Sequence, residues 1–154
     1  IRKGKDMSML KIGSEAPHFS LENQNGDLVD LSDFCGKKVL LWFVPRAFGK
    51  NWTVEAKGFR DRVQEFQDKN SELIGITFSS VNDLRDWSEA CGMKINLLCD
   101  AKRDVAIAYG AAESRDQERA TRISVLISED GTILKIYEGF DVSSHPDEVL
   151  ADLS

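Results

Sequence analysis

Residues 38–61, KVLLWFVPRAFGKNWTVEAKGFRD, join two different hydrophobic patterns. From Lys38 to Val44 the run is almost wholly apolar and rich in β-formers, which is typical of a short strand buried on both faces. Pro45 ends this run because it lacks a backbone N–H. From Asn51 to about Lys69 apolar residues recur at helical spacing, with Asn51 as the candidate cap. The stretch therefore predicts a buried strand that leads into an amphipathic helix.

The segments on either side continue the alternation of strands and helices. Near the start, two short alternating pieces flank Asn25-Gly26, a dipeptide typical of hairpin turns. Further strands are predicted at 72–78 and 94–100 and as a hairpin at 121–139, and helices at 79–92, 103–110 and 145–154. These elements indicate one α/β domain over residues 10–154, with a mixed sheet covered on both faces and an N-terminal β-hairpin.

The pattern also predicts where several side chains lie. In the helix over 79–92, Leu84, Trp87 and Ala90 share the inward face, and Ser80 or Asn82 supplies the cap. For both histidines of the chain, His18 and His145, a solvated surface position is the expectation.

Composition narrows the class of protein and of partner. The net charge of −6 disfavours non-specific binding to nucleic acid or to an anionic membrane surface. No apolar run approaches the ~20 residues that span a bilayer, and no signal-peptide core follows the basic start. We expect a cytoplasmic protein without nucleic-acid or membrane partners, and residues 1–9 to be a disordered or non-native tail.

The three cysteines, Cys35, Cys91 and Cys99, are odd in number and widely spaced. This arrangement does not resemble a disulfide framework or a zinc knuckle, so it predicts free thiols in a reducing compartment. The two histidines lie far apart in the sequence, and we therefore expect no metal site and no cofactor.

Several pieces of the sequence, taken in order, resemble one family. They are GSEAPHFSL, LSDFCGKKVLLWFVPRAF, KGFRDR, LLCDAKRDVAIAYG, ATRISVLISEDGTI and HPDEVL, and together they extend from about residue 11 to the end. The chain resembles a peroxiredoxin of the alkyl hydroperoxide reductase (AhpC/TSA) and bacterioferritin-comigratory type. The resemblance implies a thioredoxin-like fold and, as the family's activity, thiol-dependent reduction of hydrogen peroxide and alkyl hydroperoxides.

The active-site motif of that family, P-x-x-x-T-x-x-C, corresponds here to PRAFGKNW. Pro45 matches, whereas Gly49 replaces the threonine and Trp52 replaces the peroxidatic cysteine. Arg122 matches the arginine that the family supplies from the hairpin strand. Lys57 stands where many members carry a nearby resolving cysteine. The resemblance thus retains two of the four site positions.

Peroxide reduction in this family requires a thiolate, whose pKa is lowered at a helix start and beside an arginine. Indole offers no comparable nucleophile, so Trp52 predicts a catalytically silent homologue. We expect Gly49 to make room for the indole, which would fill the former peroxide pocket. Arg122 is either a structural partner, paired with Glu55 or stacked on Trp52, or a residue retained for catalysis.

Two other hypotheses remain open at the level of the sequence. The chain could be a thiol oxidoreductase that uses a relocated cysteine, with Cys35 in an exposed turn beside two lysines, Cys91 near a helix end and Cys99 at a strand end as candidates. It could also be an altered form of an active peroxidase. A thioredoxin-type reductant is expected only if the chain is active. Otherwise we expect a protein partner at the former active-site face, and a monomer or weak homodimer.

Overall fold

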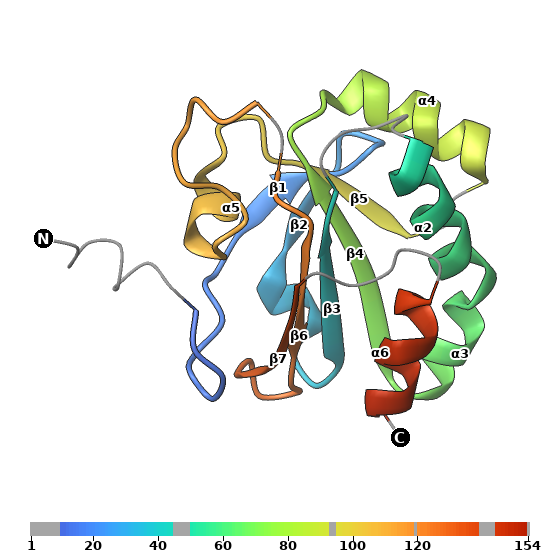
Figure 1. Ribbon diagram of the computed structural model, residues 1–154, viewed down its shortest axis with the longest axis vertical. Helices are drawn as coiled ribbons and strands as arrows, with labels where there is room; N and C mark the ends of the chain where they lie inside the picture. Colours follow the sequence, from blue (N-terminus) through green and yellow to red (C-terminus); the bar gives the residue numbers. More distant parts are fainter. Residues whose placement is uncertain (1–9, 45–49, 93–94, 119, 139–143, 154) are drawn as a thin grey trace, which may run out of the picture.

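The computed structural model describes residues 10–44, 50–92, 95–118, 120–138 and 144–153, with the backbone alone for residues 50–52 and 55 (Figure 1). Pro45 and Gly49 therefore lie outside the described residues. The strands are β1 Ser20–Glu22, β2 Leu28–Asp30, β3 Lys38–Phe43, β4 Ser71–Thr77, β5 Asn96–Cys99, β6 Ile123–Ile127 and β7 Ile133–Glu138. The helices are the 3₁₀ helix η1 Leu31–Phe34, α2 Lys50–Asp61, α3 Val63–Asp68, α4 Val81–Cys91, α5 Asp104–Ala108 and α6 His145–Leu153.

Five strands form the main sheet in the order β5-β4-β3-β6-β7. The parallel pairs are β3 with β4 and β4 with β5, whereas β6 pairs antiparallel with both β3 and β7. Leu41 at the centre of β3 faces Ile74 on one side and Val125 on the other. The β3 run is apolar throughout because both of its faces are covered, and the predicted mixed sheet is confirmed.

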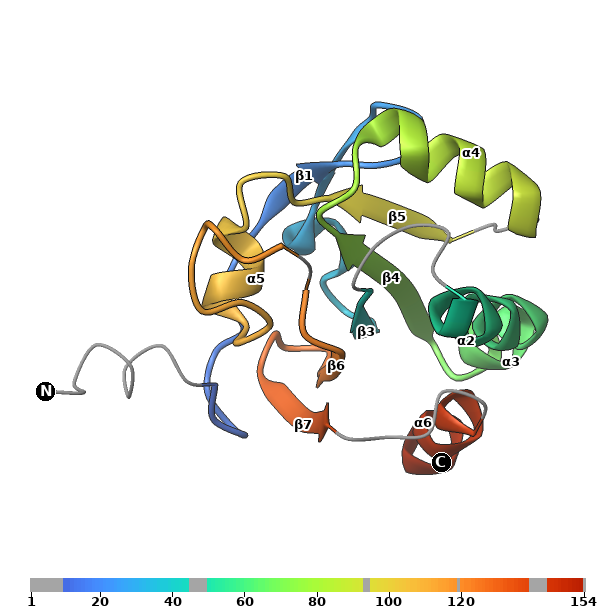
Figure 2. The same cartoon turned by 45° about the horizontal axis from the view of Figure 1, so that its top comes forward.

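The two faces of the sheet carry separate hydrophobic clusters. One cluster packs the sheet against α2, α3, α4 and α6, and the other packs it against the N-terminal segment, η1 and α5. Figures 1 and 2 show these helices on opposite sides of the twisted sheet. Trp42 and Trp87 lie in the first cluster and are 1% exposed, as expected for core residues. The chain thus has a thioredoxin-like, three-layered arrangement.

The predicted N-terminal hairpin forms as β1 and β2, with Gly26 at φ +82° in its turn. Two amide side chains of this turn dock it onto β5. Gln24 accepts a hydrogen bond from Leu97 N over 2.9 Å and donates one to Ile95 O over 2.9 Å, and Asn23 donates to Asn96 Oδ1 over 2.9 Å. The side chain of Gln24 thus pairs with backbone groups of β5 and of the residue just before it, as a neighbouring strand would.

The single helix predicted from Asn51 to about Lys69 is two helices. The helix begins at Lys50, so Asn51 lies inside it rather than at its cap. At Arg62 the backbone leaves helical geometry (φ −116°, ψ 12°), and its N–H bonds Phe59 O in a tighter turn. The inward residues Phe59 and Phe66 nevertheless stay fully buried on one face, which explains why the apolar spacing did not reveal the break.

Other local predictions mostly hold. Ser80 caps α4 by accepting a hydrogen bond from Asp83 N over 3.2 Å, and Gly92 ends the helix at φ +65°. Ala90 was expected to face inward and is exposed, because Ser88 and Cys91 occupy the buried stripe beside Leu84 and Trp87. In the part of the chain that the structure describes, no helix is long and apolar enough to cross a membrane.

Candidate functional site

The candidate site lies where β3 leads into α2. β3 ends at Phe43, and Trp52 is the third residue of α2. The predicted succession of buried strand and helix is therefore confirmed, and the backbone of Trp52 is in the first helical turn. In that turn the backbone N–H groups lack intrahelical partners and favour negative charge. The predicted filling of the site by the Trp52 side chain, and its steric relation to Gly49, lie outside the described residues.

Helix α2 is held against the sheet by aromatic packing. Ala56 and Phe59 are fully buried, and the Phe59 ring lies 5.1 Å from that of Trp42 on β3. The Trp87 indole N–H donates to Thr53 Oγ1 over 3.1 Å, which joins α4 to the residue after Trp52. The start of α2 is therefore tied to α4, and its later part to the sheet.

A second link joins the two helices further along. Arg60 Nη1 donates to Cys91 O at the end of α4 over 2.6 Å, and Arg60 Nε bonds the neighbouring Asp61 over 2.9 Å. Lys57, which the family resemblance places at the position of a resolving cysteine in many members, is exposed. These contacts fix how α2 and α4 lie relative to each other.

Arg122 immediately precedes β6 and is partly exposed. Its strand lies next to β3, so the fold places Arg122 near the end of the sheet from which α2 starts. The proposed pairing of Arg122 with Glu55, and its stacking on Trp52, remain predictions because those two side chains are not among the described ones.

The three thiols lie in different environments. Cys35 is exposed in the turn between η1 and β3, at the other end of β3 from α2. Cys91 is buried at the end of α4, and Cys99 is half-buried at the end of β5. Burial raises the pKa of both the Cys91 and the Cys99 thiol, which disfavours the nucleophilic thiolate at neutral pH.

A buried carboxylate, Asp100, lies at the end of the sheet from which α2 starts and has a structural role. Asp100 follows β5, is 1% exposed, and accepts hydrogen bonds from Ala106 N over 2.7 Å and Val105 N over 3.3 Å. Burial raises the pKa of Asp100, opposed by these hydrogen bonds. Asp100 therefore holds the start of α5 in place.

The expectation that His145 lies at the protein surface is wrong. It is 0% exposed, with Nε2 2.9 Å from Ser124 Oγ and Nδ1 3.0 Å from Glu148 Oε1. The order Ser124, His145, Glu148 has the connectivity of a hydrolase triad, but Ser124 is also 0% exposed, so no substrate can reach its hydroxyl. The cluster instead joins α6 to β6.

Sequence reasoning missed this cluster because its partners lie far apart. Ser124 precedes His145 by 21 residues, and nothing in the periodicity of either segment links them. The only available signal was a polar residue, Ser124, inside the apolar run ISVLI, which requires a hydrogen-bonding partner when buried. Among the described residues no group of three or more histidine, cysteine, aspartate or glutamate side chains could hold a metal ion.

Comparison with known proteins assigns the chain to a family. The sequence model of the AhpC/TSA family matches residues 12–136. The chain belongs to the AhpC/TSA family. It is 35% identical to Peroxiredoxin Bcp of Escherichia coli K12 over 149 residues, which cover 94% of this chain and 96% of the relative. A putative peroxiredoxin bcp of Helicobacter pylori J99 is 30% identical over 152 residues, covering 96% and 100%.

Two solved structures that resemble this chain agree with this assignment. Peroxidoxin BcpB from Mycobacterium tuberculosis superposes with a TM-score of 0.87 at 28% identity, covering 94% of this chain and 96% of that one. The reduced 2-Cys peroxiredoxin of Plasmodium vivax gives a TM-score of 0.80 at 26% identity, covering 92% and 93%. The recognition of the family and of its thioredoxin-like fold is confirmed.

Proposed function

We propose that this member of the AhpC/TSA family does not reduce peroxides and that its former active-site face binds a protein partner or serves a regulatory role. One observation carries the proposal: α2, the helix that would hold the peroxidatic thiol, reads KNWTVEAKGFRD and contains no cysteine. Without a thiolate in the first turn, no sulfenic acid can form there, and the family's cycle cannot begin.

The positions of the remaining thiols support this proposal. Cys91 and Cys99 have raised pKa values and lack a helix N-terminus to stabilise a thiolate. Cys35 is accessible, but it lies at the opposite end of β3 from α2 and Arg122. None of the three therefore replaces the missing sulfur at the start of α2.

A partner-binding role is supported by exposed apolar and charged side chains on α2 and on the segment before β6. Val54 on α2 is an apolar side chain that is 49% exposed, and the α5–β6 segment contributes several exposed charged residues from Glu113 to Glu118. The packing of α2 against α4 and the sheet holds this helix in place, which lowers the entropic cost of binding to it.

A second candidate function is favoured by the accessibility of Cys35. An exposed thiol that lines a pocket can attack a peroxide or a disulfide if a reductant later regenerates it. On this alternative the chain is a thiol oxidoreductase with a relocated cysteine and requires a thioredoxin-type partner.

Peroxide consumption with a thioredoxin or glutathione reducing system separates these two functions. Our proposal expects the rate with wild-type protein to equal the rate without it, for both hydrogen peroxide and an alkyl hydroperoxide. Cys35→Ser, Cys91→Ser and Cys99→Ser variants are measured in parallel. Turnover by the wild type that disappears in one variant overturns the proposal and identifies the relocated cysteine.

A further inference from the structure

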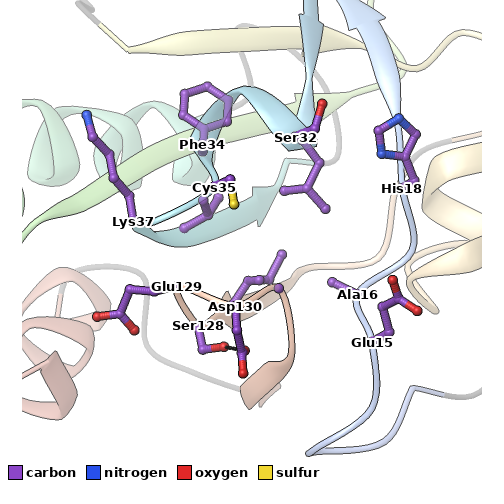
Figure 3. A pocket seen from close by; sticks show the side chains of 14 residues that line it. Glu15, Ala16, His18, Ser32, Phe34, Cys35, Lys37, Ser128, Glu129 and Asp130 are labelled. Atoms are coloured by element: carbon purple, nitrogen blue, oxygen red, sulfur yellow. Dashed lines mark hydrogen bonds between the residues drawn. The ribbon is translucent and has the colours of Figure 1, made fainter.

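A pocket of about 250 Å³ lies at the end of the sheet where β3 begins, opposite to the end from which α2 starts (Figure 3). Three chain segments that are distant in sequence enclose it. Cys35 belongs to the wall formed by η1 and the turn into β3, Asp130 lies across from it in the β6–β7 turn, and Glu15 and His18 close the side. The proposed function uses none of these residues except, in its alternative form, Cys35.

The inner part of the pocket is apolar. Ala16, Val39 and Ile127 are 6%, 1% and 1% exposed, and the partly buried Leu31 and Phe34 extend the apolar lining outward. Such a lining favours the hydrocarbon part of a ligand, since its contact removes apolar surface from water.

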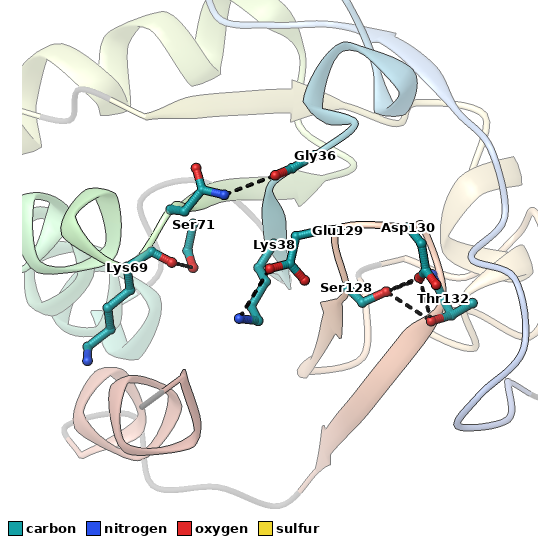
Figure 4. Close-up of polar contacts among 9 residues, drawn as sticks. Gly36, Lys38, Lys69, Ser71, Ser128, Glu129, Asp130 and Thr132 are labelled. Carbon is teal, nitrogen blue, oxygen red and sulfur yellow. Dashed lines mark hydrogen bonds and ion pairs between the residues drawn. The ribbon is translucent and has the colours of Figure 1, made fainter.

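The opposite wall is pre-formed by hydrogen bonds within the β6–β7 turn (Figure 4). Asp130 accepts from Thr132 N over 3.1 Å, from Thr132 Oγ1 over 2.9 Å and from the Ser128 hydroxyl. Gly36 N donates to Glu129 O over 3.1 Å, which joins this turn to the Cys35 wall. A ligand would therefore meet a site that is already ordered.

The charges around the pocket are mainly negative. Glu15, Glu129 and Asp130 contribute three carboxylates, and the hydrogen bonds from Ser128 and Thr132 lower the pKa of Asp130, which keeps it ionised. Lys37 is the one lysine among the described lining residues, and its Nζ lies 3.2 Å from the Glu72 carboxylate outside the pocket.

Ion pairing leaves part of this charge uncompensated. Lys38 Nζ lies 3.5 Å from Glu129 Oε2. Glu15 and Asp130 form no ion pair among the described residues. The described lining residues thus include three carboxylates and one lysine, and this excess of negative charge favours a cation over an anion.

From the apolar lining, the pre-formed turn and the excess of carboxylates, we propose that this pocket binds a small organic cation, an ammonium group carried on an apolar body. The apolar body contacts Val39, Ile127 and Phe34, and the ammonium group lies toward Glu15 and Asp130. Binding is independent of peroxide chemistry at α2.

Cys35 provides the readout, because it is the exposed thiol in the pocket, whereas Cys91 is buried and Cys99 half-buried. The full chain is alkylated with iodoacetamide, which is uncharged, and modification of Cys35 is followed by peptide mass spectrometry. Three probes with similar apolar bodies are compared: phenethylamine as cation, 2-phenylethanol as neutral analogue and 3-phenylpropionate as anion.

Phenethylamine should slow alkylation of Cys35 in a saturable manner, by a factor of about 1 + [L]/Kd, so about fourfold at three times Kd. The neutral alcohol should protect less and the anion not at all. Equal protection by cation and anion, or no protection by phenethylamine at any concentration, overturns the proposal.

A matched pair of variants tests the charge. Glu15→Gln removes a pocket carboxylate, whereas Glu65→Gln removes an exposed carboxylate on α3 and gives the same net charge. Glu15→Gln should raise the Kd for phenethylamine by about threefold, within the range of partly exposed ion pairs. Glu65→Gln should leave Kd unchanged, and an equal effect of both variants refutes a specific site.

Discussion

Trp87 donates its indole N–H to the Thr53 hydroxyl over 3.1 Å, so that α4 is joined to α2 one residue beyond Trp52. Trp87 is 1% exposed, which means that its N–H cannot turn to water if Thr53 is removed. The contact therefore stabilises the beginning of α2, where we propose that Trp52 replaces the family's peroxidatic cysteine.

Replacement of this hydroxyl should destabilise the protein. Thr53→Val keeps the shape of the side chain but leaves a buried N–H without an acceptor, at a cost of about 1–3 kcal/mol. We expect the free energy of unfolding in urea to fall by that amount. Thr53→Ser, which keeps the acceptor, should lose clearly less, and equal losses in Thr53→Val and Thr53→Ser would show that the hydrogen bond is not responsible.

The burial of His145 should make stability depend on pH. Desolvation lowers its pKa below the ordinary 6.5, an effect partly opposed by Glu148. The unfolded chain therefore binds a proton at a higher pH than the folded one. The contribution of neutral His145 is complete above about pH 6.5 and is lost as the pH falls from there through the lowered pKa.

This dependence can be isolated by a variant that cannot titrate. In wild type the unfolding free energy should decrease between pH 7.5 and pH 5.5, which lies above the ordinary pKa range of carboxylates. In a Ser124→Ala/His145→Phe double variant, which leaves no orphaned hydroxyl, the slope should be markedly smaller. A slope as steep as that of wild type would assign the pH effect to other groups.

The difference between what the sequence predicted and what it missed follows from the range of the interactions. The Asn25-Gly26 turn, the β3 run and the hairpin at 121–139 depend on residues that are close together in the chain, and each was located correctly. The burial of His145 depends on Ser124, which a fold must first bring near, and the break at Arg62 leaves the apolar stripe intact.

For the functional residues, too, the sequence predicts what depends on residue type and misses what depends on the fold. The proposal that Trp52 replaces the peroxidatic cysteine follows from the resemblance to the family motif alone, because chemistry depends on residue type. The pocket beside Cys35 could not be predicted, since its walls come from residues near 15, 35 and 130 that meet only in the folded protein. Exposure of Cys35 was expected, but its neighbours were not.

Gly75 in β4 is required by close packing rather than by backbone conformation. A Cβ at this position would lie 2.9 Å from Leu97 Cδ2 and 3.1 Å from Trp42 Cε3. Both neighbours are 1% exposed and held within the core, so Gly75→Ala should overpack it and reduce the free energy of unfolding by about 1–3 kcal/mol.

A double-mutant cycle tests this cause. Leu97→Ala removes the closest atom, so the effect of Gly75→Ala should be smaller in that background than in wild type. Strictly additive free energies, measured by urea denaturation of all four proteins, would exclude the contact with Leu97 as the source.

Restoring the family motif should restore reactivity with peroxide. The double variant Gly49→Thr/Trp52→Cys supplies the hydroxyl of the motif and a thiol in the first turn of α2, where backbone N–H groups favour a thiolate. We expect it to form sulfenic acid with hydrogen peroxide at least about tenfold faster than wild type, equivalent to about 1.4 kcal/mol of activation free energy. Trapping of the sulfenic acid followed by mass spectrometry locates the modified residue.

Gly49→Thr/Trp52→Ser is the matched control, because it makes the same change in volume without a thiol. It should react no faster than wild type, and circular dichroism should show the same secondary structure in both variants. If the cysteine variant folds and still forms no sulfenic acid, the silence has a cause beyond these two positions, and Arg122 becomes the next residue to examine. If wild type reacts with peroxide as fast as the variant, a relocated cysteine carries the reaction, and the proposal that the protein is catalytically silent is wrong.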